Sequence, residues 1–163
     1  MYEYGTGVVV KDVAEALTWY RNAADQGHAG AQYNLGLMHE YGTDFVVKDA
    51  AEAVEWYFKA ANQGEADAQC KLGYMYAEGI GAVKDAAKAV EWYRKAADQS
   101  HVIAQYHLGV MYEYGTGVAT DTAEAVKLYR KAADQGHAGA QRILNNMYDF
   151  CTTTGALGIM DQG

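Results

Sequence analysis

The side chains best suited to covalent chemistry in this sequence are Cys70, its neighbour Lys71, and His107. A cysteine nucleophile needs a base within hydrogen-bonding reach, and the helical spacing places Cys70 and His107 on neighbouring helices. The alternative is that Cys70 is a small residue at a position where Tyr33 and Tyr106 stand in other parts of the sequence. We favour this alternative and assign no catalytic residue.

Metal and phosphate binding have little support in the sequence. His28, His101 and His137 recur at one position of a repeated pattern, so we expect them about 10 Å apart, one helix diameter. Zinc needs its nitrogen ligands at about 2 Å, which favours surface histidines over a metal site. The Gly-Thr-Gly segments at 5–7 and 115–117 lack the preceding strand of a phosphate-binding loop, and we expect helix-ending turns there. We therefore predict no metal and no cofactor.

Charge and hydropathy narrow the classes of function. A net charge of −8 disfavours nucleic acid, whose phosphates need Lys and Arg. The same charge favours basic peptides or basic protein surfaces. No stretch of 18 apolar residues occurs, so we expect no membrane span. The first residues do not resemble a signal peptide, and the two cysteines fit no paired framework, which leaves the compartment open.

A repeat of about 36 residues dominates the sequence. Its clearest landmark is an Ala-Gln pair, which stands at 31–32, 68–69, 104–105 and 140–141. The segment 20–32 reads YRNAADQGHAGAQ, and 129–141 reads YRKAADQGHAGAQ. Each unit has two stretches with apolar residues at helical spacing. We therefore predict helix-turn-helix units that stack into a solenoid, because one such unit cannot bury its apolar face alone.

Each unit carries local signals for where its helices begin and end. The first helix is expected near 32–41, and its internal Gly36 suggests that a neighbouring helix backbone comes close. The second helix is expected to follow Asp49, whose spacing from Glu52 is that of a capping box. Equivalent caps are expected at Asp12, Asp85 and Asp121. The second helices are expected to end at Gly27, Gly64, Ser100 and Gly136.

The repeat divides the chain into five segments. Three whole repeats are predicted at 31–67, 68–103 and 104–139. Residues 1–30 are predicted to be a partial leading repeat with only its second helix. Residues 140–163 are predicted to be a partial terminal repeat whose tail is irregular after Tyr148.

The two ends differ from the polar capping repeats that usually close such arrays. Trp19 and Tyr20 lack an upstream neighbour, and Asn145 stands where the earlier units have a glycine. We therefore expect either an excerpt of a longer protein or end-to-end association of copies. The similarity between the repeats also leaves open an excised or engineered array without an activity of its own. The alternative is that an end helix simply exposes apolar surface.

The recurring pattern is A-Q-Y-x-L-G-x-M-Y-x-x-G-x-G-V-x-x-D-x-x-E-A-V-x-W-Y-x-K-A-A-x-Q-G, and 106–136 matches it almost throughout. This pattern resembles the Sel-1-like repeat family, a relative of tetratricopeptide repeats, over Met1 to about Tyr148. The resemblance implies an all-α, right-handed α/α superhelical solenoid that binds a protein or peptide. Some cysteine-rich bacterial relatives are described as penicillin-binding or β-lactam-hydrolysing. The regular cysteine spacing that forms their disulfides is absent from this sequence, which counts against this activity. A hydrolase is therefore kept as the alternative function and not as the main one.

The resemblance also implies a binding face. By analogy with tetratricopeptide repeats, residues of the first helices line the concave side. Tyrosines there would anchor a partner, and the glutamates would suit a basic ligand. The alternative is that part of this tyrosine ladder packs between repeats. The predicted partner-binding set is Tyr33, Leu37, Glu40, Tyr41, Cys70, Tyr74, Glu78, Tyr106, Val110, Glu113 and Tyr114.

Overall fold

The computed structural model describes residues 6–153, with side chains from Glu15 to Phe150. This part of the chain forms eight helices. Helices α1 to α8 span Thr6–Asp25, Ala29–Tyr41, Ala50–Asn62, Ala66–Glu78, Ala86–Asp98, Val102–Tyr114, Thr122–Asp134 and Ala138–Thr153. The predicted turn at Gly5 and most of the predicted irregular tail lie outside the described residues.

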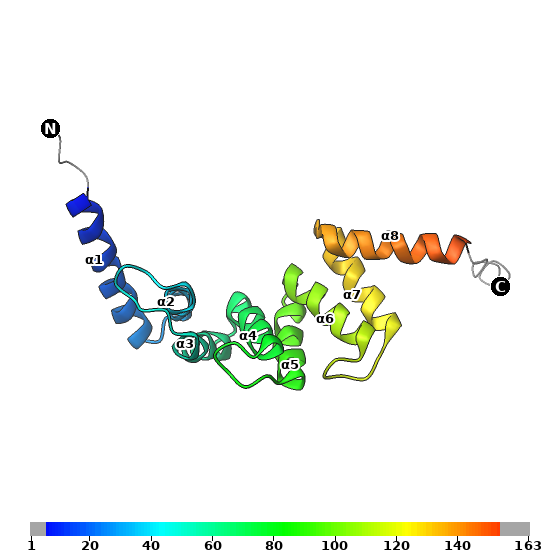
Figure 1. Cartoon of the computed structure of the whole chain (residues 1–163), viewed down its shortest axis with the longest axis horizontal. Helices are drawn as coiled ribbons and strands as arrows, with labels where there is room; N and C mark the ends of the chain where they lie inside the picture. Colours follow the sequence, from blue (N-terminus) through cyan, green and yellow to red (C-terminus); the bar gives the residue numbers. More distant parts are fainter. Residues whose placement is uncertain (1–5, 154–163) are drawn as a thin grey trace.

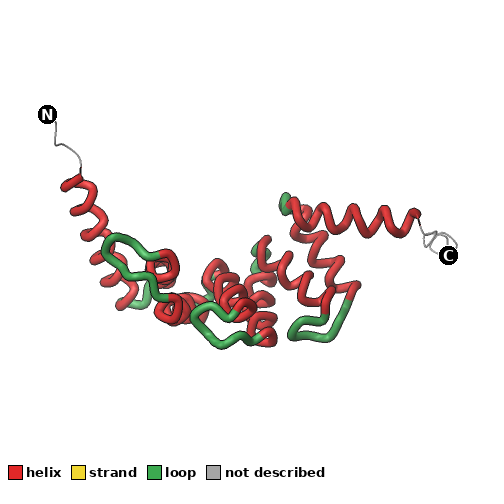
Figure 2. The backbone as a smooth tube through the Cα atoms, viewed as in Figure 1, coloured by secondary structure: helices red, strands yellow, loops and turns green. Residues whose placement is uncertain are grey.

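The helices are arranged as stacked antiparallel pairs. Helix α2 packs against α3, α4 against α5, and α6 against α7, and each pair packs against the next. The chain follows an open arc with α1 and α8 at its ends (Figure 1). A long loop connects the two helices of each pair, and a short turn connects one pair to the next (Figure 2). These features confirm the predicted all-α solenoid.

Aspartate caps start three of the second helices, as the sequence predicts. The Asp49 carboxylate accepts hydrogen bonds from the backbone N–H groups of Ala51 and Glu52 at 3.0 and 3.1 Å. The Asp49 N–H donates to the carbonyl of His39 at 2.8 Å, which ties the loop to α2. The same two kinds of bond are made by Asp85 and Asp121.

The cap predicted at Asp12 is wrong, because α1 runs without a break from Thr6 to Asp25. The predicted turn at Gly7 is helical for the same reason. In the later repeats the loop before the aspartate is tied to a preceding first helix. Among the described residues no first helix precedes α1. A loop before Asp12 would therefore lack the helix that holds the equivalent loops in the later repeats, and this segment is helical instead. At the other end, α8 continues to Thr153, beyond the predicted limit at Tyr148.

The repeated helix glycines lie against a tyrosine ring of the neighbouring helix, whose atoms are the nearest to each glycine. A Cβ atom on Gly36 would lie 2.5 Å from Cδ1 and Cε1 of Tyr57, which is fully buried on α3. Gly73 and Gly109 meet tyrosine rings in the same way, those of Tyr93 and Tyr129. The first and second helices of a pair can therefore pack closely only because this position has no side chain.

Buried glutamines link each repeat to the one before it. The Gln32 amide donates to the carbonyl of Ala24 at 3.0 Å and accepts from Gln63 at 2.7 Å. Gln69 and Gln105 make the equivalent bonds in the next two repeats. The Ala-Gln landmark therefore marks a buried polar group whose hydrogen bonds are satisfied within the stack.

Candidate functional site

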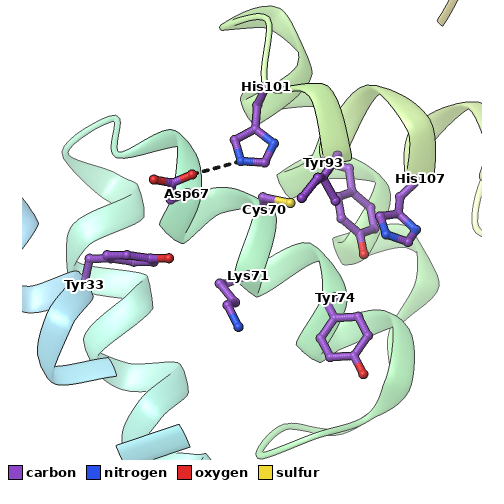
Figure 3. A pocket seen from close by; sticks show the side chains of 9 residues that line it. Tyr33, Asp67, Cys70, Lys71, Tyr74, Tyr93, His101 and His107 are labelled. Carbon is purple, nitrogen blue, oxygen red and sulfur yellow. Dashed lines mark hydrogen bonds and ion pairs between the residues drawn. The ribbon is translucent and has the colours of Figure 1, made fainter. Parts of the chain in front are cut away.

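A pocket of about 250 Å³ opens on the face formed by the first helices α2, α4 and α6, here called the first-helix face. Helices α4 and α6 contact each other directly beside it. Its lining residues are Tyr33, Asp67, Cys70, Lys71, Tyr74, Tyr93, His101, Ile103 and His107. Figure 3 shows Cys70 in the middle of this pocket, with Tyr33 on one side and Tyr93 and His107 on the other.

The pocket exists because the middle repeat has a cysteine where its neighbours have a tyrosine. In the preceding repeat the Tyr33 ring packs on the buried Tyr57, with 5.6 Å between ring centroids. In the following repeat Tyr106 packs on Tyr129 at 6.0 Å. The short side chain of Cys70 cannot fill the equivalent space beside Tyr93. The sequence reading of Cys70 as a small residue at a tyrosine position therefore has a structural consequence, a hollow.

The charged groups on the rim of the pocket are paired. The Lys71 ammonium lies 2.9 Å from both carboxylate oxygens of Glu40 and donates to the Tyr41 hydroxyl at 2.9 Å. Nδ1 of His101 accepts from the backbone N–H at the start of α6, so Nε2 carries a proton that it donates to Asp67 at 3.0 Å. These pairs surround an aromatic and apolar interior.

The geometry around Cys70 does not favour nucleophilic catalysis. Burial, with a further contribution from Asp67, raises the pKa of the Cys70 thiol to about 12. Burial and the neighbouring His137 lower the pKa of His107, and this ring stacks on Tyr93. No hydrogen bond joins Cys70 to a base among the residues that the structure describes. A thiol held in this state is a poor nucleophile at neutral pH.

Five residues of the predicted binding set lie around this pocket and a second one beside it. The second pocket, of about 230 Å³, shares Tyr74, Tyr93 and His107 with the first. The five predicted residues that line one or both pockets are Tyr33, Cys70, Tyr74, Glu78 and Val110.

The other six predicted residues have different surroundings. Glu40 and Tyr41 hold Lys71 at the rim of the first pocket. Leu37 packs against the core, and Tyr106 stacks on His137. Glu113 and Tyr114 line a separate hollow against α8.

Two of the three predicted ligand-binding glutamates are acceptors for buried tyrosines. The Tyr129 hydroxyl donates to Glu113 at 2.6 Å, and the Tyr57 hydroxyl donates to Glu40. Burial raises the pKa of Glu40, but the hydrogen bonds from Tyr57 and Lys71 outweigh this and lower it overall. Glu78 is exposed and makes no such bond. Two of the three glutamates therefore already have a hydrogen-bond partner within the repeat, and Glu78 is the one that is exposed without such a bond.

Sequence reasoning missed Asp67, Tyr93, His101 and Ile103 as pocket residues. Asp67 and Ile103 stand at the same position of successive repeats, and all four residues meet only because α4, α5 and α6 stack. The histidine at this recurring position was expected on the surface. In the structure, His101 and His137 cap the helices that follow them.

Comparisons with known proteins agree with this architecture. A family model described as the Sel1 repeat matches residues 1–28, 29–65, 66–101 and 102–137. Among solved structures, c5321, a protective antigen of uropathogenic Escherichia coli displaying an SLR fold, is 36% identical with a TM-score of 0.80. A Sel1 repeat protein from Oxalobacter formigenes is 44% identical with a TM-score of 0.77. Helicobacter pylori cysteine rich protein B is 26% identical with a TM-score of 0.64.

The matches differ in how much of each protein they cover. The c5321 match covers 91% of this chain but 31% of that protein, and the Oxalobacter match covers 82% and 54%. The Helicobacter match covers 85% of this chain and 99% of that protein. A search of curated proteins found no match.

Sel1 repeat proteins generally serve as scaffolds for protein–protein interactions. None of the helices in the described residues is both long and apolar enough to cross a bilayer. The family model covers most of the sequence in four consecutive copies, and the helix pairs follow the same period. The chain therefore belongs to the Sel1 repeat family.

Proposed function

We propose that this protein binds a peptide segment of a partner protein on its first-helix face, centred on the two adjoining pockets. The observation that carries the proposal is the pocket at Cys70, a concave aromatic hollow with a polar rim. Pockets of this kind are the usual places where a binding surface takes up an anchoring side chain. No observation in the described residues favours the hydrolase alternative.

The chemistry of the face supports a peptide ligand. Tyr74 and Ile103 are exposed beside the pocket, and each offers apolar area that a partner would cover. Covering them would also exclude water from the paired ions at the rim. The net charge of −8 supports a basic partner through long-range attraction, and exposed Glu78 adds to it at the second pocket.

Replacing Tyr74 tests this proposal. Tyr74→Ala is expected to weaken binding of a partner peptide by about 2 kcal/mol, or roughly thirtyfold, because central aromatic residues carry much of the binding energy. The matched control is Phe58→Ala on α3. Phe58 is 45% exposed against 43% for Tyr74, and it lines neither pocket. Partners would be isolated by affinity purification and the affinities measured by isothermal titration calorimetry. Equal affinity of both variants and the unmodified protein would exclude the first-helix face.

Association between copies is a second proposal, supported by the complementary ends of the described array. Helix α1 is a second helix without a first helix on it, and its Trp19 is 68% exposed beside a hollow that includes Tyr20. Helix α8 is a first helix without a second. If α8 of one copy packed on α1 of another as in the interior repeats, Asn145 would meet Tyr20 where glycines elsewhere leave space.

Asn145 is therefore expected to limit this association. Asn145→Gly should strengthen self-association at micromolar concentration relative to the unmodified protein. Sedimentation velocity over a concentration series measures this directly. Asn146→Gly, at the next position of α8, is the control for the effect of a new helix glycine. If Asn145→Gly associates no more strongly than the Asn146→Gly control, α8 of one copy does not pack on α1 of another in the way that helices pack in the interior repeats.

A further inference from the structure

We propose that the pocket at Cys70 receives one aromatic side chain of the bound partner, in the place that a tyrosine of this chain fills in the neighbouring repeats. The inference rests on the proposed peptide-binding function and specifies the residue class that the peptide presents. The ring of the ligand would pack on Tyr93 as Tyr33 packs on Tyr57 and Tyr106 packs on Tyr129 in the flanking repeats.

The first support is the comparison of the three repeats. In the flanking repeats the space against the buried second-helix tyrosine is occupied by the rings of Tyr33 and Tyr106. The floor of the empty space, formed by Tyr93 across from Gly73, keeps the geometry of the other two repeats. The His107 ring stacks on Tyr93 at 5.3 Å, and the space that stays open is the part that a side chain longer than Cys70 would fill from the first helix. A flat ring is therefore the shape that the surrounding residues already accommodate.

The second support is the hydroxyl group of Tyr93. The residue is 2% exposed and lines both pockets. The equivalent hydroxyls of Tyr57 and Tyr129 donate to carboxylates of their own repeats. That of Tyr93 has no hydrogen-bond partner among the described residues. A ligand that brings an oxygen atom to this hydroxyl would supply the acceptor that Tyr57 and Tyr129 find within their own repeats.

The surroundings also discriminate between side-chain classes. Lys71 lies on one side of the pocket and would repel a lysine or arginine side chain (Figure 3). Asp67 lies one turn earlier on the same helix and would repel a carboxylate. Both charges are already paired, Lys71 with Glu40 and Asp67 with His101. The remaining lining atoms of Tyr33, Tyr74 and His107 are aromatic, and rings pack favourably against rings in offset or edge contacts. An uncharged aromatic group satisfies all of these constraints.

A fragment titration tests the inference without a known partner. The probe is p-cresol, the side-chain analogue of tyrosine, added to the isotope-labelled full chain and followed by amide chemical shifts. We expect saturable shifts centred on Cys70, Tyr74, Tyr93 and His107. n-Butylamine, the lysine side-chain analogue, is expected to give none there. An absence of saturable p-cresol shifts at these amides would overturn the inference.

Filling the pocket from within provides the matched variant. Cys70→Tyr should fold, since tyrosine occupies this position in both flanking repeats, and should weaken p-cresol binding at least tenfold. Cys70→Ala keeps the space open and should bind p-cresol within twofold of the unmodified protein. If Cys70→Tyr does not fold, Ile103→Trp at the mouth of the pocket is expected to block binding in the same way. Undiminished binding to the folded blocking variant would contradict the proposal.

A peptide array separates this inference from the proposed function. Peptides with one varied central residue are expected to bind best with tyrosine, phenylalanine or tryptophan at that position. Binding that depends on Tyr74 but shows no aromatic preference would overturn the inference and leave the proposed function intact. Partner peptides that ignore Tyr74→Ala would overturn the proposed function and with it the partner's place in the pocket, whereas saturable p-cresol binding would still show that the pocket accepts an aromatic ring.

Discussion

Raising the pH from 9 to 11 is expected to reduce the free energy of unfolding by about 4 kcal/mol. The cause is three tyrosines on the second helices, Tyr57, Tyr93 and Tyr129, which are almost fully buried. Burial raises the pKa of all three well above the ordinary value of 10, and nearby carboxylates add to the effect. In the unfolded chain these tyrosines ionise near pH 10, whereas in the folded chain they stay protonated.

The direction of this effect follows from proton binding. The folded state holds more protons than the unfolded state above pH 10, so stability is complete below that pH and is lost above it. Each tyrosine contributes about 1.4 kcal/mol by pH 11. Lys71, whose pKa is lowered by burial but raised overall by its bonds to Tyr41 and Glu40, acts in the same direction.

Denaturant titrations followed by circular dichroism at pH 8, 9, 10 and 11 would measure the loss. Tyr93→Phe is the most suitable control, because the Tyr93 hydroxyl has no hydrogen-bond partner among the described residues. This variant should reduce the loss between pH 9 and 11 by about one third, since it removes one of three groups. A flat stability profile over this range would show that the buried tyrosines titrate alike in both states.

Gly36→Ala is expected to destabilise the protein by about 2 kcal/mol, even though alanine is the better helix former. The new methyl group would lie 2.5 Å from the ring of Tyr57, which is fully buried and cannot move without displacing its neighbours. The strain of overpacking therefore exceeds the gain in helix propensity. For a chain of this size the midpoint of thermal unfolding should fall by about 4 to 8 °C.

Gly30→Ala on the same helix is the matched control, because a Cβ atom at Gly30 would meet nothing within 4 Å. It should stabilise the protein by about 0.5 kcal/mol, through helix propensity and a less flexible unfolded chain. Differential scanning calorimetry of both variants gives the comparison. Similar midpoints for Gly36→Ala and Gly30→Ala would mean that the tyrosine ring yields easily, and that the glycine does not determine how closely the helices pack.

The sequence by itself determined the features that depend on neighbouring residues. Asp49, Asp85 and Asp121 start helices because an aspartate carboxylate reaches backbone N–H groups two or three residues ahead. Gly64 and Gly136 end helices because they adopt positive φ, and Ser100 takes the same conformation at 64°. Because these local signals recur along the chain, the repeat length and the family can also be recognised from the sequence. The cap predicted at Asp12 is wrong because it also needed a preceding helix to hold the loop.

The tertiary structure decided which groups meet across helices. Glu40 reads as a free carboxylate in sequence, but packing places it on the Tyr57 hydroxyl of the next helix. Gly36 reads as a site of backbone contact, but the neighbour is a tyrosine ring. The substitution at Cys70 is visible in the alignment of repeats, yet the hollow beside it depends on how α4, α5 and α6 stack. Such contacts join residues far apart in sequence, so local periodicity predicts the helices but not what lies between them.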